Sequence, residues 1–315
     1  MADDPKGPIV DLMLLTGLLA SGVRFAMPLL FAALGETVGQ KSGVLNVGLE
    51  GIMLVGAFLA VAFSVATGSP WGGLLAAILG GAAMGLLHGL FAVRLKVDQI
   101  VSGLALILLG LGLSGFGYRL VFAGNQTVRV LGFERIDLGP LSDLPVLGPL
   151  LFSHHALAYL GLVMAVGLWW ILTRTGLGLT IRAVGENPAA ADSAGIDVDK
   201  VRMRCAAFGG AMAGIGGAYL STAQLAGFVE DMVAGRGFIA IACVVFARWN
   251  PLGVLAVALI FGIADAGQIR LQPLFPQVPY QFFIILPYVL ALVALAGAAR
   301  SSSLPMALGQ PYRKA

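Results

Sequence analysis

The chain has 315 residues, of which 58% are hydrophobic and 11% are charged, and its mean hydropathy is +0.93. Soluble domains carry about 25% charged residues, so this composition excludes a soluble globular protein and indicates an all-α polytopic membrane protein. The formal net charge of +3 comes without a basic patch interleaved with aromatic residues, which argues against binding of nucleic acid.

A helix needs about 20 apolar residues to cross the hydrocarbon core of a bilayer. On this criterion we expect about nine transmembrane helices, some of them discontinuous, in a single transmembrane domain over residues 1–315. Their expected ranges are 12–34, 45–66, 72–93, 99–121, 156–173, 202–221, 237–247, 252–268 and 280–299. Arg24 and Pro28 interrupt the first range, which predicts a kink. Glycines four residues apart predict close helix packing; they are Gly81, Gly85 and Gly89 in the third range and Gly210 and Gly214 in the sixth.

The seventh range, 237–247, is short for a crossing, and its direction decides the topology. If it crosses, the N-terminus lies outside and the C-terminus inside, with twelve of the 19 basic residues on the inner side and six on the outer side. If it turns back, the split is nine to nine. Because basic residues favour the cytoplasmic side, we expect a crossing.

Residues 42–58 are apolar enough to lie in a bilayer, yet they include Asn46 and Glu50. These two residues are four apart, so on a helix they share one face. A carboxylate at membrane depth costs about 2.5–3.5 kcal/mol, and the glycines around it indicate backbone that is broken or closely packed. We interpret the stretch as the lining of a pathway, with Glu50 in a structural or gating role held by a hydrogen bond. A tightly packed helix whose polar residue is tied to a neighbour is the alternative.

Other polar residues are less informative. Asp265 lies near the outer end of the eighth range and is either interfacial or part of a vestibule. We interpret His88 as a helix-packing residue in preference to a proton relay. The adjacent residues His154 and His155 do not share a helix face, so we expect no metal site. The chain has no G-x-x-x-x-G-K-[ST] loop for ATP hydrolysis and no constellation of catalytic residues.

Two hydrophilic loops stand out. The loop at about 122–155 is expected outside the membrane as an ordered cap, and the loop at about 174–200 is expected in the cytoplasm. The second loop contains a predicted short helix, with Asn187 as N-cap, Pro188 at the first helical position and Gly195 at the stop. A small, alanine-rich helix outside the bilayer is suited to dock in a groove of another protein; an ordinary surface helix is the alternative.

Five sequence motifs resemble those of the permease subunits of bacterial ABC importers of the ribose and branched-chain-amino-acid type. The nearest likeness is to the nucleoside and simple-sugar branch, which works with basic-membrane-protein-type binding proteins. The motifs are GET at 35–37, SGVLNVGLEGIM at 42–53, DQIVSG at 98–103, the loop at 174–196 and RWNPLG at 248–253. The resemblance covers about residues 20–300. It departs in two places: an additional N-terminal span of the ribose-type permeases has no counterpart, and Ala247 stands where glycine is commoner.

The resemblance implies a permease that moves a small polar solute by alternating access in the bacterial plasma (inner) membrane. It implies no cofactor on this chain, because ATP is bound by a partner ATPase, often with two fused nucleotide-binding domains. The other implied partners are a second related permease and an extracytoplasmic substrate-binding lipoprotein. A purine nucleoside is the leading solute and a pentose or hexose the second, while a proton-coupled secondary transporter using Glu50 or Asp265 remains the alternative class.

The expected site residues fall into two groups. The substrate pathway comprises Asn46, Glu50, Gln99, Phe238 and Asp265. The segment 187–194 becomes the expected coupling helix, and the residues expected to couple to the ATPase are Arg182, Glu186, Asn187, Pro188, Ala190 and Ala191.

Overall fold

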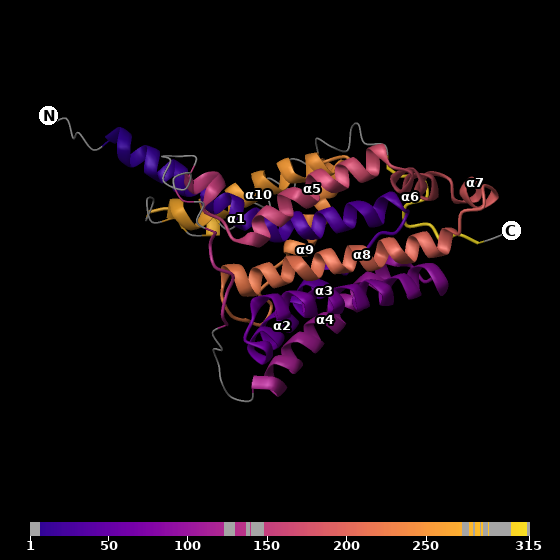
Figure 1. The fold of residues 1–315 in the computed structure, drawn as a ribbon, viewed down its shortest axis with the longest axis horizontal. Helices are drawn as coiled ribbons and strands as arrows, with labels where there is room; N and C mark the ends of the chain where they lie inside the picture. The colour runs from indigo at the N-terminus through magenta and orange to yellow at the C-terminus, as the bar shows by residue number, and fades with distance from the viewer. Residues whose placement is uncertain are drawn as a thin grey trace.

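The computed structural model describes residues 7–122, 130–136, 139, 148–272, 277–279, 281–283, 285, 289 and 304–313. All the regular elements in this part of the chain are helices (Figure 1). They are α1 (Gly7–Lys41), α2 (Leu49–Thr67), α3 (Pro70–Gly89), α4 (Gln99–Phe122), α5 (Ala156–Arg174), α6 (Gly176–Glu186), α7 (Pro188–Ser193), α8 (Val198–Ala218), α9 (Arg236–Phe246) and α10 (Pro251–Leu271). Short π-helical stretches are η1 (Leu90–Arg94), η3 (Gly148–Phe152) and η4 (Tyr219–Gln224). The expected all-α fold is confirmed.

Six of the described helices are long and apolar enough to cross a membrane: α1, α2, α3, α4, α5 and α10. Helix α8 has 21 residues but carries four charged residues between positions 199 and 204, and α9 has only 11 residues. The last expected helix, 280–299, lies largely outside the described residues. The chain is therefore a multi-pass membrane protein, and the count of nine stays a prediction.

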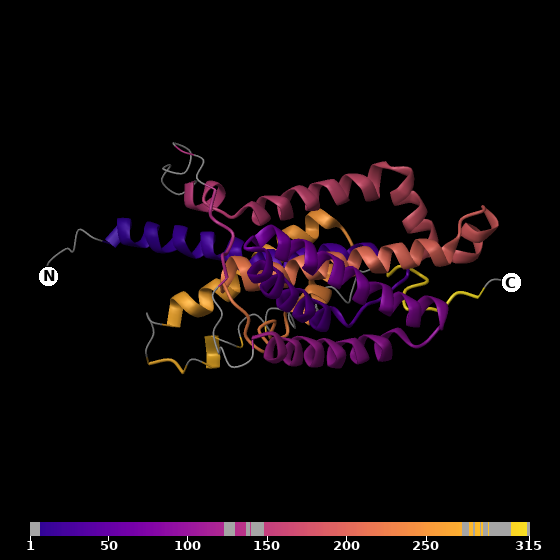
Figure 2. The ribbon, with the colours of Figure 1, turned by 60° about the horizontal axis from the view of Figure 1, so that its bottom comes forward.

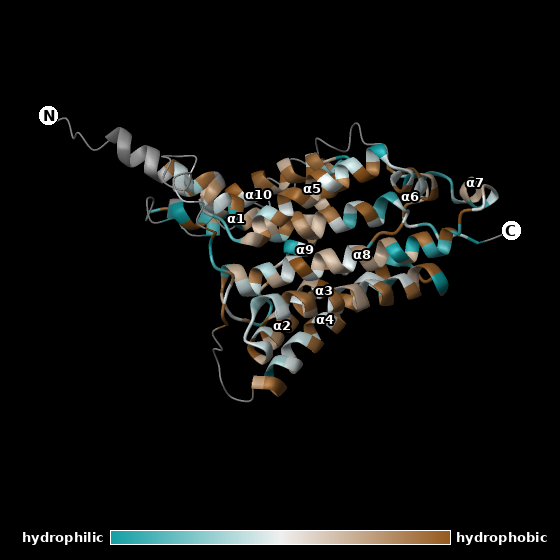
Figure 3. Cartoon of the chain, viewed as in Figure 1, coloured by the Kyte–Doolittle hydropathy of each residue, from teal (hydrophilic) through white to brown (hydrophobic). Residues whose placement is uncertain are grey.

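Helices α1, α2 and α8 form the centre of the bundle. Helix α1 packs against α5, α9 and α10 on one side, whereas α8 packs against α2 and α3, and α4 covers α2. Figure 1 shows this arrangement, with α5 and α10 at one edge and α4 at the other. The outward faces carry exposed apolar side chains such as Leu79, Leu108 and Val163, which give these helices their hydrophobic colouring in Figure 3. This is the surface that lipid covers.

Helices α3 and α8 approach one another through glycine. A Cβ added at Gly81 would meet the carbonyl of Gly210, and one at Gly85 would meet the carbonyl of Ala206. Any larger residue would push the two backbones apart. The predicted packing of the glycines in the third and sixth ranges is confirmed.

Helix α1 continues through Pro28 without a break. Proline has no N–H group, so the carbonyl of the residue four positions earlier, Arg24, loses its helical partner. The Nε2 atom of Gln224 in η4 donates to that carbonyl at 2.8 Å. The first range is therefore helical throughout, and a side chain from another element replaces the missing hydrogen bond. The kink expected there stays a prediction.

The seventh segment joins the two ends of the bundle in two parts. Residues 225–235 are irregular, and the N–H of Val130 in the outer loop donates to the carbonyl of Ala226 at 3.1 Å. Helix α9 follows, and just after it Trp249 Nε1 donates to Gln40 Oε1, at the end of α1, at 2.7 Å. Eleven residues of α-helix span about 16 Å, roughly half of the hydrocarbon core. Helix α9 alone is therefore too short to cross the membrane, and the crossing of this segment stays a prediction.

The topology can be tested with reporter fusions. The described part of the 122–155 loop and residues 304–313 lie at opposite ends of the bundle (Figures 1 and 2). Because basic residues favour the inner side, a reporter that fluoresces only in the cytoplasm should fluoresce when fused after Ala315 and stay dark when inserted into the 122–155 loop. Fluorescence from the loop insertion would contradict this orientation.

Candidate translocation pathway and coupling surface

Glu50 lies in the first turn of α2, is buried, and faces the start of α9. Its Oε1 atom accepts a hydrogen bond from the N–H of Gly235, and its Oε2 atom accepts one from the N–H of Gly237, both at 2.7 Å. The first N–H groups of a helix have no partner within it, and the helix dipole favours a negative group there. Glu50 therefore caps α9 inside the bundle, and its predicted interior hydrogen bonding is confirmed.

Asn46 does not share a helix face with Glu50, contrary to the expectation from their spacing. Helix α2 begins at Leu49, and residues 44–46 are not helical. Asn46 Oδ1 instead accepts from the N–H of Gly48 at 2.9 Å. The asparagine side chain thus builds the turn that leads into α2, which explains why it is separate from the helix face.

A buried polar cluster ties this turn to α1 and to the α9–α10 connection. Glu36 Oε1 accepts from the N–H of Asn46 at 2.9 Å and from Gln40 Nε2 at 2.9 Å. Gln40 in turn accepts from the indole of Trp249. Glu36, Gln40 and Asn46 are all at most 4% exposed. The cluster joins two parts of the chain that are more than 200 residues apart in sequence.

Gln99 and His88 hold the same turn from the other side. Gln99 Oε1 accepts from the N–H of Leu45 at 2.7 Å. The imidazole of His88 lies between the Leu45 carbonyl, at 3.0 Å, and the Ser102 hydroxyl, at 3.1 Å. Both ring nitrogens of His88 are engaged, which agrees with the predicted packing role.

A cavity of about 570 Å³ lies between α1, η4, α9, α10 and the 122–155 loop, at the end of the bundle that is predicted to face outward. We call it the outer cavity. Four arginines line it: Arg24, Arg135, Arg236 and Arg270. His155 also lines it and lies outside the membrane-spanning helices. Burial lowers the pKa of the His155 imidazole, so the ring is neutral near pH 7 and the positive charge of the cavity comes from the arginines.

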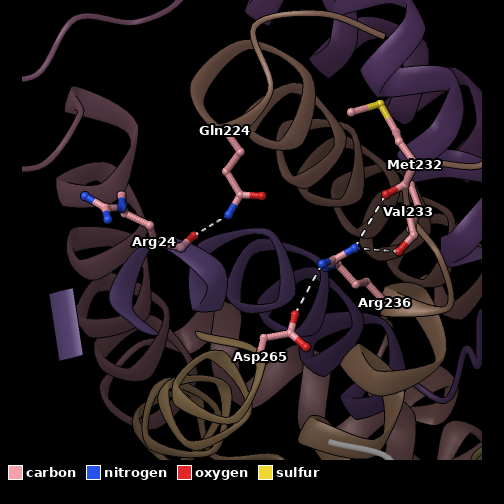
Figure 4. A network of polar contacts seen from close by, with 6 residues as sticks. All are labelled: Arg24, Gln224, Met232, Val233, Arg236 and Asp265. Carbon is pink, nitrogen blue, oxygen red and sulfur yellow. Dashed lines mark hydrogen bonds and ion pairs between the residues drawn. The ribbon is translucent and has the colours of Figure 1, made fainter. Parts of the chain in front are cut away.

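Asp265 lies beside the outer cavity, paired with one of these arginines. Arg236 Nη2 is 3.2 Å from Asp265 Oδ2, and Arg236 Nη1 donates to the carbonyls of Val233 at 3.2 Å and Met232 at 3.5 Å (Figure 4). The carboxylate of Asp265 is largely shielded from solvent. Asp265 is not among the residues that line the cavity, and its role, interfacial or vestibular, stays a prediction.

The five predicted pathway residues therefore fall into two groups. Glu50 bonds to the start of α9, whose first turn also holds Phe238, an exposed residue, and Arg236, which pairs with Asp265. Asn46 and Gln99 belong instead to the polar cluster at the inner end. Their roles in transport stay predictions.

The sequence analysis did not include Arg24, Gln224 and Arg270 among the site residues. Arg24 was interpreted only as an interruption of a span. A charged residue inside an apolar helix is itself a signal of a functional or buried polar site. Gln224 and Arg270 gave no such signal, because both lie near the ends of apolar segments, where polar residues are ordinary.

The coupling loop forms the predicted capped helix at the inner end. Helix α7 projects beyond the bundle and is joined to it by α6 (Figure 2). Asn187 Oδ1 accepts from the N–H of Ala190 at 3.0 Å, Pro188 occupies the first turn, and Gly195 has φ +84° after the helix. The helix and its caps are confirmed.

The six predicted coupling residues differ in accessibility. Ala190 is exposed, whereas Ala191 is buried against Val184 and Val198 of its own chain. Ala191 therefore holds α7 in place, and its side chain is not on the surface offered to a partner. In α6, Arg182 Nε donates to the carbonyl of Gly178 at 3.3 Å, and Glu186 is exposed.

Residues 304–313, which we call the C-terminal strap, pack across this inner end. The N–H of Ala307 donates to the carbonyl of Gly185 at 2.9 Å, and the N–H of Gly309 donates to the carbonyl of Gly43 at 3.1 Å. The strap therefore bonds both the end of α6 and the turn before α2.

Arg202 of α8 lies under the strap and is 1% exposed. Its Nε donates to the carbonyl of Ser42 at 3.1 Å, and its Nη1 donates to the carbonyl of Gln310 at 2.8 Å. A buried guanidinium is stable only when its donors are paired. The coupling loop, the strap and the turn before α2 thus form one hydrogen-bonded unit.

This helical bundle has a polar cavity at one end and a capped helix projecting from the other, which is the organisation of the membrane component of a transporter. The chain matches the family of permease components of branched-chain amino acid transport systems over residues 18–297. It belongs to this family. It is an ABC transporter permease, a transport subunit whose ATPase is a separate subunit.

Three relatives illustrate the range of the family. The chain is similar to the guanosine ABC transporter permease protein NupQ of Bacillus subtilis, with 39% identity over 300 residues, which cover 92% of this chain and 94% of the relative. It is 34% identical to the nucleoside ABC transporter permease protein NupC of Lactococcus lactis over 311 residues, 94% and 96% of the two chains. It is 40% identical to TsgC13 of Haloferax volcanii, a permease provisionally named for glucose transport, over 264 residues, 82% and 78% of the two chains. No solved structure gave a significant match.

Replacing Glu50 by glutamine tests its role as a cap. Glutamine keeps the shape but has a single acceptor oxygen, so one of the N–H groups of Gly235 and Gly237 loses its partner. We expect Glu50→Gln to destabilise the protein by about 1.5–3 kcal/mol, measured by thermal unfolding in detergent, and to lower uptake without changing its pH dependence. Glu230→Gln, at an exposed outer position, is the control. Normal stability together with loss of the pH dependence of uptake would instead indicate a proton carrier.

Proposed function

We propose that this chain is the permease of an ABC importer that carries a purine nucleoside across the bacterial plasma (inner) membrane. The observation that carries the proposal is the similarity to two permeases named for guanosine and nucleoside transport, over 92% and 94% of this chain. A simple sugar is the second candidate solute, because the relative provisionally named for glucose is equally similar over a shorter region.

The proposed partners follow from the same class. A separate ATPase, with two nucleotide-binding domains in one chain, binds and hydrolyses ATP, so this chain needs no cofactor. A second related permease completes the membrane part, and an extracytoplasmic lipoprotein delivers the solute to the outer end. The exposed face of α7, which includes Ala190, is the proposed contact for the ATPase.

The hydrogen-bonded contacts described above offer a route from the ATPase to the pathway. A displacement of α7 moves the end of α6, where Gly185 is bonded to the strap and packs directly against Lys41 at the end of α1. The strap and Arg202 hold the turn before α2. That turn leads directly to Glu50, which caps α9. These contacts support the proposal that the two ends of the bundle move together, as alternating access requires.

Uptake by the assembled transporter tests the solute. Proteoliposomes with the permease pair, the ATPase and the binding lipoprotein should take up radiolabelled guanosine only when ATP is supplied. A hundredfold excess of ribose or glucose should leave this uptake unchanged, whereas inosine should compete. Uptake of glucose that guanosine does not inhibit would establish the sugar alternative, and uptake that needs no ATP would establish a secondary transporter.

The coupling helix is tested by Ala190→Arg. The substitution places a long charged side chain on the exposed face of α7, where an unpaired charge in a packed contact costs several kcal/mol. Because Ala190 is exposed in the permease itself, the protein should fold and insert normally. We expect uptake to fall at least tenfold and the ATPase to be lost from pull-downs.

The matched control is Ala190→Ser, which stays small and should keep both uptake and ATPase binding. Ala191→Arg is unsuitable as a test, because Ala191 is buried and an arginine there would disturb the fold. Normal uptake by Ala190→Arg at normal expression would show that the ATPase binds elsewhere.

A further inference from the structure

Two guanidinium groups of the outer cavity converge on one hydroxyl. Arg24 Nη2 donates to Ser21 Oγ at 3.0 Å, and Arg270 Nη2 donates to the same oxygen at 3.1 Å. Helix α1 leaves room for this arrangement at Gly17, where an added Cβ would lie 2.5 Å from Arg270 Nη1. Two like charges are therefore held close together at the wall of the cavity.

Asp265, the acidic residue beside the cavity, already forms an ion pair. Among the described residues, the ion pair at this site is that of Arg236 with Asp265, and the two Nη atoms of Arg236 are occupied by Asp265, Val233 and Met232. Arg24, Arg135 and Arg270 add three further positive charges to the lining. Arg24 is half-buried, and Arg135 and Arg270 are exposed. Like charges repel one another, so an acceptor-rich group between them is favoured.

The donors and acceptors of the lining indicate which kind of group fits. A guanidinium only donates hydrogen bonds, whereas a sugar hydroxyl both donates and accepts. Guanine and hypoxanthine present two adjacent acceptors, the ring N7 and the carbonyl O6, which match the fork of an arginine. Adenine carries an amino group in place of the carbonyl, so its N–H donors would face the N–H donors of the arginine.

Gln224 adds an acceptor to the same cavity. Its Nε2 atom is used by the carbonyl of Arg24, and its Oε1 atom points away from that contact (Figure 4). An oxopurine has a ring N–H beside its carbonyl, which suits such an acceptor. The cavity volume of about 570 Å³ lies within the usual range for small-molecule sites, about 300–1,000 Å³.

We propose that the outer cavity binds the acceptor edge of an oxopurine base through Arg24 and Arg270. The inference rests on the proposed function and narrows it: guanosine and inosine are accepted over adenosine and over free sugars. The arginines would then contribute to selectivity within the permease, after the binding protein has delivered the solute.

The test uses Arg24→Lys and Arg270→Lys in the complete transporter in proteoliposomes. Lysine keeps the charge but lacks the fork that binds two acceptors at once. The probes are radiolabelled guanosine and 7-deazaguanosine, which lacks the N7 acceptor. We expect the wild type to prefer guanosine about tenfold in kcat/KM and each lysine variant to lower this ratio severalfold relative to the wild type. The same binding protein is used throughout, so its own selectivity cancels in the comparison.

Arg119→Lys is the matched control, because Arg119 is an exposed arginine of α4 paired with Glu230, and its ratio should equal that of the wild type. If a lysine variant fails to fold, Ser21→Ala is a second test. It removes the hydroxyl that holds both guanidinium groups together, so it should raise KM for guanosine more than for 7-deazaguanosine.

An unchanged ratio in folded variants would overturn the inference. So would an equal loss of all solutes together with loss of binding-protein association, which would mark the arginines as a docking surface. A wild type that transports no nucleoside would instead contradict the proposed function on which the inference rests.

Discussion

The structure depends on one constraint: backbone groups inside a bilayer need hydrogen-bond partners within the protein. Helix α9 begins in the interior of the bundle, so its first N–H groups have no water to bind. Glu50 meets this need with both carboxyl oxygens, on Gly235 and Gly237. Glu50, a charged residue that is costly in a membrane, thereby allows a helix to begin inside the bundle.

The same constraint explains two other polar contacts. Pro28 leaves the carbonyl of Arg24 without a helical donor, and Gln224 supplies one from η4. Residues 44–46 are not helical, and the side chains of Gln99 and Glu36 accept from their N–H groups. In each case irregular or interrupted backbone is matched by a side chain from a different helix. These contacts fix the positions of the polar residues inside the bundle.

Composition and periodicity were enough to predict the helical class, the close approach of another helix at Gly81 and Gly85, and the caps of α7. These features depend on local sequence or on a repeat along one helix. The partners of Glu50 could not be predicted in this way, because Gly235 and Gly237 are 185 and 187 residues away. The spacing of Asn46 and Glu50 was misleading for a physical reason. The Asn46 side chain accepts a hydrogen bond from the N–H of Gly48 in a turn, and α2 begins only after this turn, at Leu49. Likewise Arg24, Arg270 and Ser21 become a site only when α1 and α10 pack side by side, which no single stretch of sequence shows.

The position of the C-terminal strap sets an order of maturation. Arg202 lies in α8, yet one of its acceptors is the carbonyl of Gln310, more than 100 residues later. While the ribosome is still making the intervening chain, that guanidinium has not received its full set of partners, and the end of α6 still lacks its bond from Ala307. The inner face therefore becomes rigid only once the helices that precede the strap have been made. Permease that is still being synthesised therefore lacks the hydrogen bonds that join the strap to Gly185, Gly43 and Arg202.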